Sequence, residues 1–280
     1  MKKIVSFVLV FVLSGCSSKL AYNNLDWLIY WHLDDYIELT EPQEEQFDAY
    51  LDSWITWHRN EELSAYVKQL QALKQDIAND NLTNQVVLAN LQQARQHWIR
   101  IREKITPQIA QLAHQVSEEQ LIQLFAALEK DNKEEDEELA ENLKRTEHER
   151  LEDRTESLID DLEERIGELS PNQKAIVAQY APQFTSTHAD WIAYRRSIQQ
   201  AARRLFVSRS TNENFVIDLV HLMNSPDDYR NESYNVNREK NNEIYAQLVA
   251  EVAQSFSSKQ KKKLLNEIQD IIDDLEDLMD

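Results

Sequence analysis

The chain carries two hydrophobic patterns, a continuous run at its start and a spaced stripe near its middle. The stripe consists of Leu139, Leu143, Leu151, Leu158, Leu162 and Ile166. These positions recur at helical intervals in a very charged segment, residues 131–168, and predict an amphipathic helix there. We expect this helix to begin at the Ser117 cap and to run unbroken to Gly167, which is far longer than average.

Other helix starts are marked by one motif, in which a Ser or Thr is followed three residues later by Gln. The motif occurs at Thr40–Gln43, Ser117–Gln120, Ser170–Gln173 and Ser257–Gln260. Each fits the capping box, in which the hydroxyl and the Gln side chain bind each other's free backbone N–H groups. Thr83 and Thr211 are weaker starts, and Gly167 is a good helix stop.

The capped segments recur in the same order, which predicts two related helical halves, residues 39–130 and 169–280. Trp54-Ile55-Thr56-Trp57-His58-Arg59 would correspond to Trp191-Ile192-Ala193-Tyr194-Arg195-Arg196. Chance similarity among helical sequences is the alternative. The expected order is a signal peptide (1–15), a lipid-anchored segment (16–38), the first half, a charged connecting helix (131–168) and the second half.

Composition favours the same fold class. The sequence has 2 glycines and 5 prolines, so few tight turns are possible, and a β-rich or Gly-loop nucleotide-binding fold is disfavoured. Good helix formers dominate. We therefore predict an all-α protein, an elongated multi-helix assembly of two related halves joined by a long charged amphipathic helix.

The continuous run predicts export. Met1-Lys2-Lys3 is basic, and Ile4–Leu13 is too short for a bilayer span, which needs roughly 20 apolar residues. Leu13-Ser14-Gly15-Cys16 resembles the lipobox of bacterial lipoproteins, which implies cleavage before Cys16 and lipid on its thiol. An ordinary secretory signal with a chance cysteine is the alternative, although Cys16 is the sole cysteine. By the same resemblance, Ser17 favours the periplasmic face of the outer membrane.

Charge restricts the partners. Removal of residues 1–15 takes away Lys2 and Lys3 and no acid, leaving 28 basic and 50 acidic residues, a net charge near −22. Nucleic acid is therefore not expected as a partner, because phosphate binding needs the opposite sign. The membrane through the Cys16 lipid, and a basic or unfolded protein in the periplasm, are the partners this surface suits.

No catalytic, cofactor or metal-binding motif is recognisable. The 7 histidines form no His-Glu-x-x-His and no pair of Glu-x-x-His motifs. Asp218 and His221 are spaced i,i+3, as are many accidental pairs. We expect no cofactor and no enzyme activity. A hydrolase built from carboxylates that folding brings together is the remaining enzymatic alternative.

The two tryptophan-basic segments are the candidate ligand or partner contact. Its residues are Trp54, Trp57, His58, Arg59, Trp191, Tyr194, Arg195 and Arg196. Trp54 and His58 are i,i+4, as are Trp191 and Arg195, so each ring lies beside a basic group that could hold an anionic or aromatic ligand. The alternative is a core aromatic residue with a basic neighbour reaching to solvent.

Two further segments have more than one interpretation. The basic residues from Arg195 to Arg209 would neutralise the carboxylates of the connecting helix, or leave an acidic surface for a basic partner. The aromatic segment Tyr22–Tyr36 suits a membrane interface or a first helix packed on the body, and Asp26, Asp34 and Asp35 favour packing.

Two resemblances extend this interpretation. Residues 13–63, including Asn23-Asn24-Leu25-Asp26-Trp27 and Trp57-His58-Arg59, resemble a family of proteobacterial lipoproteins to which no activity is assigned. Leu39-Thr40-Glu41-Pro42-Gln43 is similar to the Leu-Thr-x-x-Gln motif of the periplasmic chaperones Spy and CpxP. The first hypothesis is a non-enzymatic lipoprotein that binds or organises an envelope component; the second is a Spy-like chaperone with an acidic helical surface.

Overall fold

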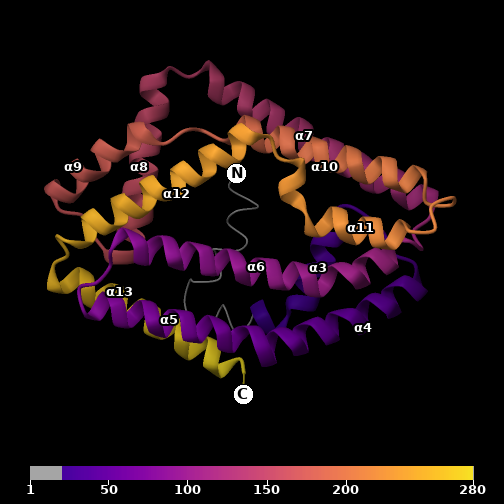
Figure 1. Ribbon diagram of the computed structural model, residues 1–280, viewed down its shortest axis with the longest axis horizontal. Helices are drawn as coiled ribbons and strands as arrows, with labels where there is room; N and C mark the ends of the chain where they lie inside the picture. The colour runs from indigo at the N-terminus through magenta and orange to yellow at the C-terminus, as the bar shows by residue number, and fades with distance from the viewer. Residues whose placement is uncertain (1–20, 280) are drawn as a thin grey trace.

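The computed structural model describes residues 21–279, in which the regular elements are helices and no strand occurs (Figure 1). The all-α prediction is therefore confirmed. The elements are α3 (Leu25–Leu33), α4 (Glu41–Trp57), the π-helix η2 (His58–Glu62), α5 (Leu63–Ala78), α6 (Asn84–Ala113), α7 (Glu118–Lys144), α8 (Glu147–Ile166), α9 (Pro171–Tyr180), the 3-10 helix η3 (Ala181–Gln183), α10 (His188–Val207), α11 (Phe215–Asn224), the 3-10 helix η4 (Pro226–Tyr229), α12 (Glu232–Ala253) and α13 (Ser258–Asp277).

The predicted capping boxes are present at the starts of α4, α7, α9 and α13. Thr83 caps α6, and Gly167 ends α8 with a φ of 83°, a value that favours glycine. The start at Thr211 is wrong: Thr211 lies in a turn, and α11 begins at Phe215 after Asn214.

The prediction of one unbroken helix from Ser117 to Gly167, and with it a single connecting helix over 131–168, is wrong. The helix stops at Lys144, and α8 starts afresh after Thr146. The break has a local cause that the sequence contains, a further capping box. The Glu149 carboxylate accepts the Thr146 backbone N–H at 2.7 Å, and the Thr146 hydroxyl accepts the Glu149 N–H at 3.2 Å.

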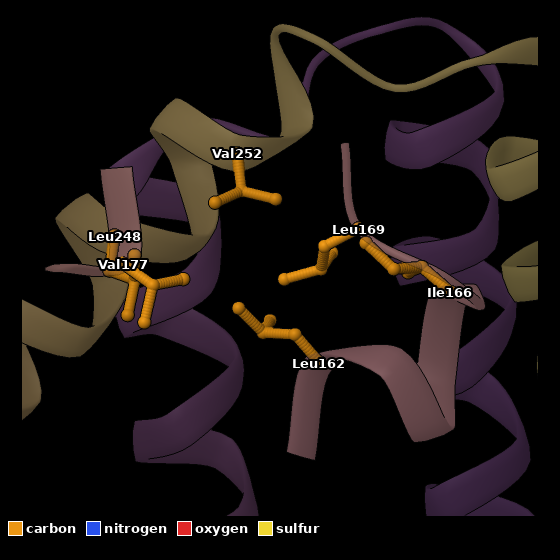
Figure 2. Close-up of a cluster of buried hydrophobic side chains, with 6 residues drawn as sticks. All are labelled: Leu162, Ile166, Leu169, Val177, Leu248 and Val252. Atoms are coloured by element: carbon orange, nitrogen blue, oxygen red, sulfur yellow. The ribbon is translucent and has the colours of Figure 1, made fainter. Parts of the chain in front are cut away.

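Helices from the two sequence halves pack on each other. α13 lies along α5, α11 and α12 contact α6, and α10 lies beside α7 (Figure 1). Buried apolar residues form separate small clusters between these pairs of helices. In the cluster of Figure 2, Leu162 and Ile166 of α8 point towards Val177 of α9 and Leu248 and Val252 of α12.

The capping glutamines pair with each other across the fold. The Nε2 of Gln173 donates to the Oε1 of Gln260 at 3.2 Å, and the Nε2 of Gln260 donates back at 2.9 Å. Gln43 and Gln120 make the same reciprocal pair, at 3.2 and 2.6 Å. All four side chains are buried. Each pair therefore links two helix starts, and its hydrogen bonds satisfy amide groups that burial would otherwise leave unpaired.

The predicted signal peptide and Cys16 lie outside the described residues. Within residues 21–279, no helix combines the length and the apolar character needed to cross a bilayer. Part of the aromatic segment Tyr22–Tyr36 packs on the body, as one of its two interpretations predicts. Tyr22 is buried against Leu63 and Leu278, and the Tyr30 ring meets the Phe47 ring edge-on with 5.5 Å between centroids.

Candidate functional site

The first tryptophan-basic segment belongs partly to the core. Trp54 is 8% exposed and donates its indole N–H to Gln108 of α6. Trp57 is half-buried, donates to Glu61 at 3.0 Å and lies beneath Lys104. Core packing, the alternative to a ligand contact, therefore describes Trp54.

The two basic residues of this segment contact Tyr22 and Asn23. The Arg59 guanidinium lies 5.5 Å from the centre of the Tyr22 ring, and its Nη2 donates to Asn23 at 3.4 Å. His58 Nδ1 lies 2.9 Å from the Tyr22 hydroxyl. Both residues thus hold Tyr22 in place on the body.

The second segment lies in different surroundings, against α7. The Arg195 guanidinium stacks 4.8 Å from the centre of the Trp191 ring and lies 3.6 Å from Asp131 and 3.9 Å from Glu135. Tyr194 instead lies beneath Arg230, at 5.1 Å. The two segments contact different helices, and the structure does not unite their residues in one pocket.

The ion pairs of the second segment confirm the predicted internal neutralisation. Arg196 reaches Glu129 at 3.3 Å and also pairs with Asp136. Arg209 reaches Glu118 at 3.2 Å. Arg195, Arg196 and Arg209 therefore pair with carboxylates of α7.

A buried polar network adjoins the π-helix, and no sequence motif predicted it. Glu62, with its side chain 4% exposed, accepts hydrogen bonds from Arg100 on both carboxylate oxygens. His97 Nδ1 lies 3.1 Å from the same carboxylate, and His97 Nε2 lies 2.8 Å from Oε1 of the Gln69 side chain. The side of this network that faces solvent is Arg100, which is half-exposed.

The π-turn explains why Glu62 faces inward. At about 100° per residue, the eight residues from Trp54 to Glu62 would leave Glu62 about 80° away from the Trp54 face in a regular helix. A π-turn takes up one extra residue and brings Glu62 close to that face, where both side chains meet α6. Such turns are frequent at functional sites. Here the buried Glu62 carboxylate is already bound by Arg100 and His97.

Two residues of the π-helix, His58 and Glu62, have shifted pKa values that fit their surroundings. Burial lowers the pKa of His58 by more than the nearby Glu62 charge raises it. For Glu62, burial favours the protonated acid, but hydrogen bonds from Arg100 and His97 outweigh it and leave the carboxyl pKa below its usual value. His58 is thus held neutral and Glu62 ionised.

We expect the neutral state of His58 to make folding pH-dependent. Because its folded pKa lies below 6.5, the unfolded chain binds the proton more tightly, and stability is lost as the pH falls below 6.5. The contribution has a limiting slope of about 1.4 kcal/mol per pH unit. Urea unfolding of His58→Asn between pH 7.5 and 5.5 should give a flatter profile than the wild type. His148→Asn, at an exposed histidine, is the control, and coincident profiles for wild type and His58→Asn would contradict this assignment.

An open apolar groove between α7 and α10 has the form of a binding site. It has a volume of about 580 Å³. Its lining residues are Glu118, Leu121, Ile122, Phe125, Ala126 and Glu129 of α7, with Arg203, Phe206 and Val207 of α10. Ile122 is 71% exposed and Val207 82% exposed, so each presents a branched apolar side chain to water at the mouth of the groove.

The floor of this groove is rigidly packed. The Phe125 and Phe206 rings meet edge-on with 6.1 Å between centroids, and the Arg203 guanidinium lies 4.6 Å from the centre of the Phe125 ring. Leu121 is buried beneath them against Ile37. Sequence reasoning missed this site because its residues come from two segments about eighty positions apart, and only the pairing of α7 with α10 joins them.

The groove is lined mostly by apolar side chains. The groove residues are apolar apart from Glu118, Glu129 and Arg203, and both acids take part in ion pairs with arginines. Among residues 21–279, no three His, Cys, Asp or Glu side chains gather as a metal ion would need.

The described residues form an all-α protein with an open, mostly apolar groove between α7 and α10. The chain belongs to a family of unknown function, DUF6279, whose model matches residues 35–235. This confirms the predicted membership of a family without an assigned activity. No curated protein and no solved structure gives a match.

Proposed function

We propose that this protein is a lipid-anchored, non-enzymatic binding or scaffolding protein of the cell envelope, held by Cys16 on the periplasmic face of the outer membrane. The observation that carries the binding part is the α7–α10 groove, whose mouth exposes Ile122 and Val207. Exposed apolar side chains over an apolar floor favour a protein partner, because isolated monomers keep such patches small. The lipobox sequence supports the anchoring part.

The partner proposed for the groove is an apolar segment with basic flanks. Glu118 and Glu129 at the groove are paired with Arg209 and Arg196, but the chain as a whole carries a formal net charge of −20. A basic flank would be attracted to this surface and an acidic one repelled. An apolar side chain would displace water from Phe125 and Phe206.

Substitution in the groove tests the binding part. Ile122→Asp combined with Val207→Asp should abolish recovery of the partner after in-cell crosslinking from a photoreactive residue placed at Ala126. Ile217→Asp is the matched control, since Ile217 is an apolar side chain 67% exposed on α11. An equal loss in the control variant, or undiminished crosslinking in the double variant, would contradict a role for the groove.

Replacing Cys16 tests the anchor. A multiply acylated cysteine holds a protein almost permanently, at about 0.8 kcal/mol per buried methylene. Cys16→Ser should therefore lose incorporation of labelled fatty acid and move the protein from the membrane fraction to the soluble fraction. Unchanged labelling would rule out this anchor.

The second candidate is a periplasmic chaperone of the Spy and CpxP kind, which would hold unfolded clients on the same groove. The exposed Ile122 and Val207 also favour this function. The Leu-Thr-x-x-Gln similarity does not add to it, because each of these glutamines is occupied in a cap and a buried pair. Suppression of client aggregation by Cys16→Ser protein would favour the chaperone; no suppression at molar excess would exclude it.

A further inference from the structure

Helix α3 is predominantly apolar, yet the structure leaves much of it uncovered. Its sequence, Leu25–Leu33, is apolar or aromatic at every position except Asp26 and His32, and across this range no side chain is buried. A helix that is apolar all round is found within a protein core or in contact with lipid. One face of α3 is accounted for by Ile29, Tyr30 and Leu33, which pack against the α4 cluster.

The uncovered side presents a pair of tryptophans. Trp27 and Trp31 are each 61% exposed, and their rings stack with centroids 6.5 Å apart and planes inclined by 15°. The i,i+4 spacing places both rings on one face of the helix. Tryptophan is enriched at membrane–water interfaces, because its ring is amphipathic and its N–H can bind headgroups or water.

The position of α3 in the chain favours a membrane as the occupant. From Cys16 to Ala21, the first residue that the structure describes, the chain spans at most about 18 Å. A lipid on Cys16 would therefore keep Trp27 and Trp31 near the bilayer that holds it. Tyr22 strengthens this restraint, because it is buried and is bound by His58 and Arg59.

We propose that Trp27 and Trp31 of α3 rest in the headgroup region of the membrane that carries the Cys16 lipid, and so fix the orientation of the body on it. This inference rests on the anchoring part of the proposed function. Asp26, Asp34 and Asp35 lie in or just after α3, and their charges oppose an anionic surface. Zwitterionic headgroups are accordingly the lipid class that this face would meet.

Quenching of tryptophan fluorescence tests the contact. The purified full-length chain is reconstituted in phosphatidylcholine vesicles with or without brominated acyl chains, which quench only tryptophans close to the bilayer. The protein has 6 tryptophans, so two in contact would make about a third of the emission quenchable. Trp27→Phe combined with Trp31→Phe should reduce the quenchable part to background. Trp98→Phe, which removes another exposed tryptophan, should leave it unchanged.

Two independent measurements distinguish the anchor from the tryptophan contact. The acyl mass on Cys16 tests the anchor, and loss of quenching in the double variant tests the contact. Quenching that depends on Trp27 and Trp31 supports the inference whether or not Cys16 carries lipid. Absent quenching in the wild type, or quenching retained in the double variant, overturns it. If the protein instead self-associates through Trp27 and Trp31 and lipid quenches neither, the membrane contact is overturned and a second copy of the chain covers this face.

Discussion

Replacing Arg100 with Met should lower the free energy of unfolding by about 3 kcal/mol, because it leaves a buried carboxylate without its cation. Glu62 is 3% exposed as a residue, and Arg100 binds both of its oxygens. Methionine keeps much of the apolar stem of arginine. The decrease in unfolding free energy therefore reflects the loss of the charge and of the hydrogen bonds. Urea denaturation at pH 7.5, with a constant m-value, measures it.

The matched control lies on the same helix. Arg95 forms an ion pair with Asp227 at 2.6 Å, but both side chains are about half-exposed. Arg95→Met should therefore cost only about 0–1 kcal/mol. A comparable loss of unfolding free energy in both variants would mean that the buried Glu62–Arg100 pair contributes no more than the exposed Arg95–Asp227 pair. Adding Glu62→Gln to Arg100→Met should recover much of the stability, because no stranded charge remains.

The Glu62–Arg100 pair should also make the free energy of unfolding fall at acidic pH. The folded pKa of Glu62 lies below its ordinary value of 4.5. Its contribution is therefore complete above pH 4.5 and is lost as the pH falls through the folded pKa. In Arg100→Met the hydrogen bonds that lower this pKa are reduced, so the difference in stability from the wild type should shrink as the pH falls from 7.5 to 4.

Replacing Gln173 with Ala should also lower the free energy of unfolding by about 3 kcal/mol, since several buried polar groups lose partners at once. Gln173 is 0% exposed. Its Oε1 accepts the Ser170 N–H at 2.9 Å, and its Nε2 donates to the Ser255 carbonyl oxygen and to Gln260. Thermal and urea unfolding measure the loss.

Glu149 provides the control for the cap alone. It occupies the same third position of a capping box, after Thr146, but it is exposed and the box has no partner across the fold. Glu149→Ala should cost about 1 kcal/mol. If Gln173→Ala costs no more than Glu149→Ala, the pairing of glutamines contributes nothing beyond the cap. In Gln173→Leu combined with Gln260→Leu, the loss should be smaller than the sum of the two single losses.

The candidate site was only partly predictable from the chain. Trp191 and Arg195 form the stacked pair that their spacing indicates, since i,i+4 neighbours meet on any helix. The sequence paired Trp54 with His58 in the same way, but Trp54 turns into the core and His58 turns to Tyr22 and Tyr66. The groove depends on which helices become neighbours, and no local pattern contains that information.

The sequence by itself determined the helices and most of their ends, because a cap is made by residues three positions apart and depends on little else. Even the break at Thr146, which we did not predict, follows from such a local motif. Only the tertiary structure decided that Gln43 pairs with Gln120 and Gln173 with Gln260, and that Glu62 meets Arg100. These contacts join residues 38 to 87 positions apart, and their free energy depends on burial, which exists only once the helices have packed.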